Sequence, residues 1–414
     1  MSKLLEQIKK NKETKRLGDL VVINQSSITK DFPHKVIEYI DTSSVTRNSF
    51  DKPEILNINE APSRAKRLVK DGDTILSTVR PSQHHYGFIR APKPNTIVST
   101  GFAVLTPQND IDPFYLYSYL TQDSVTSILN AIAEATTTTF PAFRPEVLSD
   151  MEIEIPDLPT QKKIAEILGA YDAKIENNNQ IIKNLELTAQ TIFDEWFVKF
   201  RFPGHGKVKM VESEMGEIPE GWEVKKVSDV AHLNKGVSYT SAEINTEHKG
   251  AALINLGNFL RGGGFNSDGI KYYTGEYKST HIVKPGQILI AMTDLTSNRE
   301  VIGHPARLPE NFKEAVISLD VCSLSPGKDI YLEFIYNSML KRSFSKLMAS
   351  CASGTNVSHL KKENIEGYDL IFPEESLLVQ FNNFTQPVFT KQAILEEENQ
   401  RLKQSRDQLL AKLI

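Results

Sequence analysis

The sequence contains only two cysteines among its 414 residues, Cys322 and Cys351. Two thiols are too few for the disulfide framework of a small secreted protein or for a cysteine zinc site. The sequence also lacks an apolar run approaching the roughly 18 residues that a membrane-spanning helix needs. Its start, MSKLLEQIKKNKETKR, has no apolar signal core. These absences predict a cytoplasmic protein with reduced thiols and no membrane partner.

Motifs of nucleotide-driven and methyl-transferring enzymes are missing as well. The sequence has no Gly-x-x-x-x-Gly-Lys-Ser/Thr phosphate loop. It also has no Asn/Asp-Pro-Pro-aromatic motif and no glycine-rich cofactor loop of the kind that an adenine methyltransferase needs. The adjacent His84 and His85 lack nearby cysteines or paired carboxylates, which is poor geometry for binding a metal. We therefore predict no catalytic residue, no metal site and no cofactor in this chain.

Neither sign of charge dominates the chain. The 48 Lys and Arg residues and 52 Asp and Glu residues give a net charge of -4, whereas a small basic DNA-binding domain carries an excess of Lys and Arg. The basic cluster of Arg64, Lys66, Arg67 and Lys70 fits a solvated surface. Near neutrality would also suit a subunit whose partners share the phosphate contacts. Charge alone therefore leaves the partner open.

The chain repeats itself. A single hydrophobic core stops growing at about 250 to 300 residues, so 414 residues predict at least two cores. Four short segments recur in the same order at offsets of 210 to 217 residues. They are Leu17–Leu20 with Val227–Val230, Asp71–Leu76 with Pro285–Ile290, Thr138–Phe143 with Thr355–Leu360, and Ile155-Pro156 with Phe372-Pro373. We interpret them as a duplicated unit that begins with about 140 residues of strand-rich sequence.

A long helix is predicted at the end of each copy, because apolar residues recur there at alternating spacings of four and three. In the first copy Asn178 interrupts this seam, which also includes Ala189, Ile192 and Trp196, and in the second copy Asn399 and Arg406 occupy seam positions. A buried seam Asn can specify the register of a helix pair. The other predicted seam residues are Ile164, Leu168, Tyr171, Ile175, Ile182, Leu185, Phe381, Val388, Leu395, Leu402 and Leu409.

Antiparallel pairing of these helices within the chain would relate the two globular domains by an approximate two-fold axis. Helices of roughly 35 to 40 residues span about 50 to 60 Å and would act as spacers. Such a pseudo-dimer could present its two domains to DNA half-sites about one or more helical turns apart. The predicted fold class is α+β, with two similar strand-rich domains separated by two long antiparallel coiled-coil helices.

Three local motifs, together with this organisation, resemble the specificity subunits of type I restriction-modification systems over essentially the whole chain. They are IPDLPTQKKIA at Ile155–Ala165, FDEWFV at Phe193–Val198 and GEIPEGW at Gly216–Trp222. The sequence departs from the family pattern at Lys15–Leu17, which lacks the Gly-Trp found before Val227, and at Glu374–Gln380, which only loosely matches the first helix entry.

The resemblance implies a non-catalytic subunit that binds double-stranded DNA through two target recognition domains, each specific for one half of a bipartite target. It implies two modification (methyltransferase) subunits docked on the helical regions, joined by motor-nuclease restriction subunits. These partners would use S-adenosylmethionine, and ATP with Mg²⁺. The expected segments are a helical segment at 1–15, target recognition domain 1 at 16–156, a central helical spacer at 157–202, a linker at 203–221, target recognition domain 2 at 222–373 and a C-terminal helix at 374–414.

Sequence-specific recognition needs polar and basic side chains on loops that reach base edges and phosphates. Two loops follow equivalent predicted strands, and a second pair of Ser/Thr-rich segments recurs at the 217-residue offset; loops that merely vary at the surface would look the same. The candidate DNA-binding residues are Arg80, Ser82, Gln83, His84, His85, Tyr86, Thr138, Thr139, Arg144, Lys235, Ser238, Tyr239, Thr293, Asp294, Ser297, Asn298, Arg299, Thr355 and Asn356.

Two other functions remain open at this point. A fused nuclease or methyltransferase would turn over DNA with Mg²⁺ or a methyl donor in the absence of partners. A protein-binding scaffold that works through its coiled coil would show no salt-dependent DNA binding, even within an assembled complex.

Overall fold

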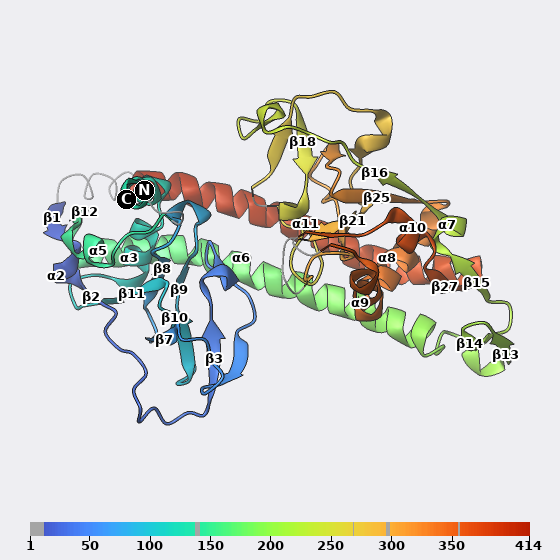
Figure 1. Ribbon diagram of the computed structural model, residues 1–414, viewed down its shortest axis with the longest axis horizontal. Coiled ribbons are helices and arrows are strands. Elements are labelled where there is room, and N and C mark those ends of the chain that lie inside the picture. Colours follow the sequence, from blue (N-terminus) through green and yellow to red (C-terminus); the bar gives the residue numbers. More distant parts are fainter. Residues whose placement is uncertain (1–11, 137–140, 268, 295–298, 355–356) are drawn as a thin grey trace. The chain divides into compact units, whose positions relative to one another are not determined.

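The computed structural model describes residues 12–136, 141–267, 269–294, 299–354 and 357–414 (Figure 1). The chain divides into two compact units, the first formed by Met1–Glu176 with Gln400–Ile414 and the second by Asn177–Asn399. Two long helices, α6 (Leu158–Phe193) and α11 (Glu375–Leu413), contribute a segment to each unit. Each unit therefore combines one strand-rich domain with a stretch of both helices.

The first unit contains two four-stranded sheets, in the strand orders β6-β3-β10-β7 and β2-β11-β8-β9. Strands β1 and β12 form a separate antiparallel pair, as do β4 and β5. The elements are β1 (Glu13–Arg16), α2 (Leu17–Leu20), β2 (Val21–Ile23), β3 (Val36–Ile40), β4 (Val45–Thr46), β5 (Ser49–Phe50), β6 (Glu54–Asn57), β7 (Ala65–Leu68), β8 (Thr74–Ser77), β9 (Tyr86–Phe88), β10 (Thr96–Ser99), β11 (Phe102–Pro107), α3 (Pro113–Leu120), α4 (Asp123–Ala135), α5 (Glu146–Asp150) and β12 (Glu152–Ile155).

The second unit repeats this plan with a four-stranded sheet β16-β25-β21-β23 and a five-stranded sheet β17-β19-β18-β24-β20. Strand pairs β13-β14, β15-β27 and β22-β26 complete it. The elements are β13 (Met210–Ser213), β14 (Gly216–Pro219), β15 (Glu223–Lys226), α7 (Val227–Val230), β16 (Ala231–Lys235), β17 (Ile244–Asn245), β18 (Ala251–Ile254), β19 (Lys271–Tyr273), β20 (Ile282–Val283), β21 (Ile288–Ala291), β22 (Thr293–Asp294), β23 (Pro305–Arg307), β24 (Ala315–Ile317), β25 (Val321–Pro326), α8 (Leu332–Leu340), α9 (Arg342–Cys351), β26 (Ser358–His359), α10 (Lys362–Glu366) and β27 (Asp369–Phe372).

The predicted strands after the two turn glycines are the central strands of equivalent sheets. Strands β8 and β21 are each four residues long and buried throughout, and each lies between two antiparallel neighbours. Their aliphatic and β-branched residues suit a strand that is covered on both faces. The predicted α+β class, with a duplicated strand-rich domain and two long helices, is therefore confirmed.

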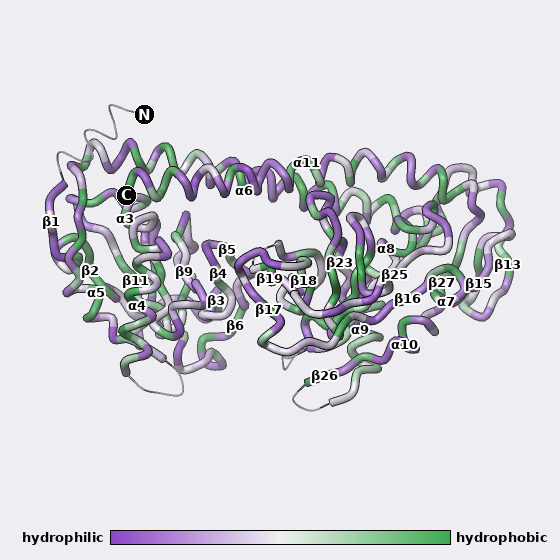
Figure 2. Tube along the Cα trace, turned by 90° about the horizontal axis from the view of Figure 1, so that it is seen from above, coloured by the Kyte–Doolittle hydropathy of each residue, from purple (hydrophilic) through white to green (hydrophobic). Residues whose placement is uncertain are grey.

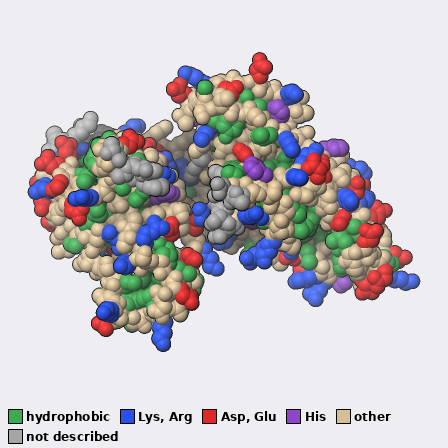
Figure 3. Space-filling view, viewed as in Figure 1, with side chains coloured by type: hydrophobic (Ala, Val, Ile, Leu, Met, Phe, Trp, Pro, Cys, Tyr) green, Lys and Arg blue, Asp and Glu red, His purple; other side chains and the backbone are tan. Residues whose placement is uncertain are grey.

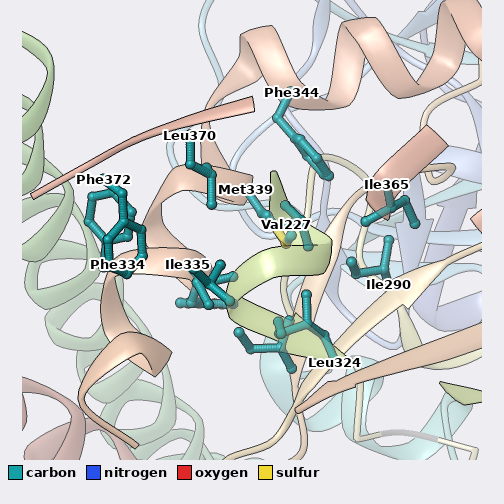
Figure 4. Packing of buried hydrophobic residues seen from close by; sticks show 14 of the residues in the cluster. Val227, Ile290, Leu324, Phe334, Ile335, Met339, Phe344, Ile365, Leu370 and Phe372 are labelled. Carbon is teal, nitrogen blue, oxygen red and sulfur yellow. The ribbon is translucent and has the colours of Figure 1, made fainter. Parts of the chain in front are cut away.

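Each domain shares its hydrophobic core with the long helices of its own unit. In the first unit, Ile164 and Leu168 of α6 and Leu413 of α11 are buried in the same cluster as Tyr115 and Leu116 of α3. In the second unit, Phe193 of α6 and Phe381 of α11 join the cluster built around Phe334, Ile335 and Val227 (Figure 4). The helices are thus part of the domain cores, and burial of their apolar seam holds them there.

The helices run antiparallel within each unit. In the first unit, Arg406 of α11 pairs with Asp172 of α6 through a 2.6 Å hydrogen bond. In the second, Asn399 of α11 contacts Asn178 of α6, and further along Gln392 of α11 donates to the carbonyl of Ile182 of α6 at 3.4 Å. Along the helix pair, residue numbers therefore increase on α6 where they decrease on α11. Hydrophilic and hydrophobic residues alternate along both helices (Figure 2), and every predicted seam residue is buried or half-buried.

Two segments differ from the sequence-based description. The predicted helical segment at 1–15 is wrong in its described part, because Glu13–Arg16 form strand β1 and pair with β12; residues 1–11 lie outside the described residues. An antiparallel partner strand overrides the local helix-forming composition there. The predicted linker at 203–221 contains the hairpin of β13 and β14. Pro387 lies inside α11, which continues past it.

A polar layer in the helix seam of the second unit predicts a measurable effect on stability. The fully buried Asn178 donates from Nδ2 to Oδ1 of Asn399 and to Oε2 of Glu398, both at 3.0 Å, and Asn399 donates to Asn179 at 2.9 Å. Replacing Asn178 by Ala leaves the acceptors of Asn399 and Glu398 without these bonds, so we expect a loss of about 1–3 kcal/mol in urea unfolding.

A double variant provides the control for this prediction. Asn178→Leu with Asn399→Leu replaces the polar layer by an apolar one and should be at least as stable as the wild type, because a seam Asn specifies register at a cost in stability. Equal losses in the single and double variants would contradict this role of the Asn pair.

Candidate nucleic-acid interface

The structure brings together the two segments that the sequence marked in the first domain. The backbone N–H of Phe143 donates to the carbonyl of Thr78 at 3.0 Å, and that of Arg80 donates to the carbonyl of Pro141 at 2.8 Å. Val79 and Ala142 also form an isolated β-bridge. Arg80 therefore follows the end of β8, and Arg144 lies beside it on the segment that leads into α5.

The second domain joins its two segments at the equivalent place. Strand β22 pairs with β26, so that Thr293 lies opposite His359 and Asp294 opposite Ser358. The backbone N–H of Leu360 donates to the carbonyl of Met292 at 2.7 Å. Each domain therefore presents the same two chain segments side by side, at the end of its central strand.

Within the first domain, burial separates the candidate residues into two groups. Ser82, Gln83 and Arg144 are exposed, and Arg80 is half-buried in a left-handed backbone conformation at φ 46°. These four side chains are placed to meet a ligand. Backbone strain of this kind at a non-glycine residue is common in binding sites.

Among the aromatic and histidine candidates of the first domain, His84 and His85 are half-buried and Tyr86 is buried. His85 Nδ1 lies 2.7 Å from the carbonyl of Val45. Burial, followed by the charge of Arg47, lowers the pKa of His84. Tyr86 is only 7% exposed. This burial assigns Tyr86 to the core of the domain and not to a DNA-facing surface.

In the second domain the exposed candidates are Lys235 and Ser238, with Tyr239 half-buried. Gly236 between them is required by close packing, because a Cβ there would lie 2.2 Å from the carbonyl oxygens of Ile317 and Ser318. The loop therefore crosses the neighbouring backbone at a point where no side chain fits.

The remaining described candidates of the second domain are structural. Thr293 and Asp294 are buried, and the Asp294 carboxylate accepts the backbone N–H groups of Val301 at 2.7 Å and Ile302 at 2.9 Å. Arg299 donates to Ser358 Oγ at 3.0 Å and to the carbonyl of Ala349 at 2.6 Å. The sequence placed them next to a turn, but Thr293 and Asp294 are buried, and the half-buried Arg299 is engaged in hydrogen bonds within its own domain. The other candidates, Thr138, Thr139, Ser297, Asn298, Thr355 and Asn356, lie outside the described residues.

Lys361 is a candidate that sequence reasoning missed. It follows the buried Leu360 as Arg144 follows the buried Phe143, and both basic side chains are exposed. Leu360 and Phe143 make the equivalent backbone bonds to Met292 and Thr78. The 217-residue offset between Arg144 and Lys361 could have identified the pair.

Three further observations bear on the site. Among the described residues no group of three or more His, Cys, Asp and Glu side chains could hold a metal ion. In the same part of the chain, no helix has the length and apolarity to cross a membrane. On the face seen in Figure 3, basic side chains are interspersed with acidic ones, in keeping with the near-neutral net charge.

Two copies of one domain plan that present polar loops at equivalent places define a duplicated recognition protein. The family model for the type I restriction modification DNA specificity domain matches residues 9–187 and 219–404, one match for each copy. The chain therefore belongs to the family of type I restriction-modification DNA specificity subunits. Its function is DNA specificity, its two domains fit a bipartite target, and it is a recognition subunit and not a catalytic one.

Individual relatives span nearly the whole chain. The specificity subunit of type I restriction enzyme HindI from Haemophilus influenzae is 27% identical, covering 91% of this chain and 93% of the relative. That of MjaIX from Methanocaldococcus jannaschii is 25% identical, covering 91% and 83%. The crystal structure of a type I restriction-modification S subunit from M. genitalium is 16% identical, with a TM-score of 0.49 and coverage of 98% and 96%.

Proposed function

We propose that this chain binds one half of a bipartite DNA target with each domain and brings two modification subunits, with restriction subunits, to that target. The observation that carries the proposal is the pair of equivalent loop junctions, at β8 in the first domain and at β22 in the second. The two junctions have equivalent backbone hydrogen bonds, but the side chains beside them differ. S-adenosylmethionine, and ATP with Mg²⁺, would be bound by the partners in the cytoplasm.

The exposed side chains at each junction would divide into two kinds of contact. We assign base-edge contacts to the exposed Ser82 and Gln83, which follow the first junction, and to the exposed Ser238, which lies on the loop after β16 of the second domain. Arg144 and Lys361 keep a positive charge at the same place in both domains. A feature common to both half-sites is the phosphate backbone, so we assign these two cations to phosphates.

The test of the proposed function is a map of methylated adenines in cells that co-express this chain with its modification subunit. We expect methylation at one bipartite motif, which disappears when the chain is deleted. Exchanging residues 16–156 for those of another family member should change one half of the motif only. A methylation pattern that does not depend on this chain would remove DNA specificity from it and favour the scaffold function.

The assignment of Arg144 and Lys361 predicts an effect of salt. In the double variant Arg144→Ala/Lys361→Ala, the slope of log K against log salt concentration should become shallower by about 2, because each lost phosphate contact contributes about 0.9. Affinity for target and non-target DNA should fall by the same factor, and the methylated motif should not change.

Two other exposed cations supply the matched control. Lys30→Ala/Lys313→Ala removes the same charge at exposed positions away from both junctions and should leave the slope unchanged. A change of base preference at one half-site in the Arg144/Lys361 variant would instead identify these residues as base-contacting.

A further inference from the structure

A set of basic residues recurs in both domains, outside the loop junctions. When the two turn glycines are aligned, RAKRLVKDG at 64–72 stands opposite KSTHIVKPG at 278–286. In each copy the first and third basic residues are exposed and the middle one is half-buried. We call these two sets the basic strips of the first and second domains. Their matched members are Arg64 with Lys278, Arg67 with His281, and Lys70 with Lys284.

Both strips flank the same strand of equivalent sheets. Strand β7 is antiparallel to β10, which is parallel to β3, and strand β20 is antiparallel to β24, which is parallel to β18. The backbone N–H of Lys70 donates to the Asp73 carboxylate at 2.8 Å, and that of Lys284 donates to Oε1 of Gln287 at 3.0 Å. These bonds use only the backbone, so they do not explain why both positions carry a lysine side chain.

The basic strip of the first domain begins next to the loop junction. The backbone N–H of Thr100 donates to the carbonyl of Arg64 at 2.8 Å. The carbonyl of the next residue, Gly101, accepts the backbone N–H of Thr78 at 2.9 Å, and Thr78 is the junction residue that bonds to Phe143. A short series of backbone hydrogen bonds therefore connects the strip to the junction.

The basic strip of the second domain adjoins the other candidate loop. Ile282 of β20 lies opposite Val316 of β24, and the carbonyl of the next residue, Ile317, accepts the backbone N–H of Val237 at 2.8 Å. The short 3₁₀ turn of this strip, Ser279–His281, also packs against β16. Val237 belongs to the loop after β16, so this strip continues the surface that carries the exposed candidates of that loop.

The exposed cations of the first strip have weak partners within the chain. Arg64 Nη2 lies 3.8 Å from a carboxylate oxygen of Asp41, and the Arg64 side chain is 62% exposed. An ion pair this exposed contributes little to stability. Lys70 Nζ donates at 2.9 Å to Oε1 of Gln25, which carries no charge. Both charges therefore remain available to an anionic ligand.

The half-buried Arg67 is also incompletely satisfied by the fold. Its Nη1 is buried and has no hydrogen-bond partner among the described residues. Burial lowers the pKa of Arg67, and the Glu146 carboxylate offsets this only in part. Folding alone thus holds this guanidinium at a cost, which a nearby negative charge would reduce.

We propose that the two basic strips bind the phosphate backbone of DNA beside the base-contacting loops. This inference rests on the proposed function and extends the DNA interface beyond the junctions. Six residues of extended chain span up to about 20 Å, a length in which one DNA strand carries about six phosphates. Arg64 and Lys70 can therefore contact different phosphates. Charge recurs between the strips although the residue types differ, as a partner common to both half-sites requires.

The test uses the full-length chain assembled with its modification subunit and measures the affinity for target DNA at several salt concentrations. The variants Arg64→Ala/Lys70→Ala and Lys278→Ala/Lys284→Ala each remove two cations from one strip. In each variant the slope of log K against log salt concentration should become shallower by about 2. The methylated motif should stay the same, because phosphate contacts carry no sequence information.

Two further variants are controls for charge and position. Arg64→Lys/Lys70→Arg keeps both charges and should keep the wild-type slope. Lys35→Ala/Lys52→Ala removes two exposed cations beside β3 and β6, which β10 separates from β7, and should also keep it. Thermal unfolding of each variant checks that the domain stays folded.

The possible outcomes separate the inference from the proposed function. A wild-type slope in the folded strip variants overturns the inference, whether or not assembly with the modification subunit is weakened. A changed methylated motif overturns it as well, because the strips would then contact bases. If the assembled wild-type protein itself bound target DNA without any dependence on salt, the proposed function would fail.

Discussion

Replacement of Arg307 by Ala should lower the free energy of unfolding of the second unit by about 3–5 kcal/mol, because it leaves a buried carboxylate without its partner. The side chains of Arg307 and Glu333 are only 16% and 14% exposed. The guanidinium also packs between Tyr336 and Phe389, which joins strand β23 to α8 and α11. Urea unfolding followed by tryptophan fluorescence measures this, since Trp196 and Trp222 both lie in the core of the second unit.

Two controls separate the buried pair from a general effect of charge. Arg16→Ala breaks an exposed ion pair with Asp150, whose side chains are 59% and 73% exposed, and it should cost at most about 1 kcal/mol. The double variant Arg307→Met/Glu333→Leu removes both charges and should recover most of the stability. A loss in the double variant as large as in Arg307→Ala would show that the stacking, and not the ion pair, dominates.

Replacement of Asp294 by Ala should destabilise the second unit by about 2–5 kcal/mol. Asp294 is 2% exposed, and its carboxylate accepts the backbone N–H groups of the half-buried Val301 and the buried Ile302, so its removal leaves two donors without this acceptor, at about 1–3 kcal/mol each. The same fluorescence measurement applies. Asp294→Asn keeps one acceptor oxygen and should lose less.

This prediction also decides between two roles for Asp294. The sequence suggests a DNA contact, because the residue begins a polar loop after a buried strand. In the structure, the Asp294 carboxylate instead accepts hydrogen bonds from the backbone N–H groups of Val301 and Ile302 at the end of this loop. An Asp294→Ala protein of wild-type stability that no longer recognised one half-site would restore the DNA-contact interpretation.

Periodic patterns in the sequence predicted the parts of the fold that depend on local spacing. The alternation of four and three predicted both long helices, and the seam residues lie buried or half-buried as that pattern requires. Heptad spacing is visible because each turn of a helix returns a side chain to the same face. The duplication was visible for a similar reason, since turn glycines and buried strands recur at a nearly constant offset.

The candidate site was less predictable. Both predicted segments of each domain lie side by side at the end of the central strand, but Tyr86, Thr293 and Asp294 are buried. A polar or aromatic residue in a loop can be a ligand contact or an internal support, and its residue type is the same in both cases. Lys361 was overlooked because a lone lysine after a leucine has no distinctive local pattern.

The sequence alone thus established the duplicated α+β organisation, the antiparallel helix seam and the resemblance that the family match confirmed. Only the tertiary structure decided which loop residues are exposed, that Glu13–Arg16 form a strand with β12, and that Arg307 pairs with Glu333 inside the second unit. The physical reason is that periodicity along the chain is a local property. Burial, strand pairing and cavity formation depend on segments far apart in sequence, whose contacts exist only after folding.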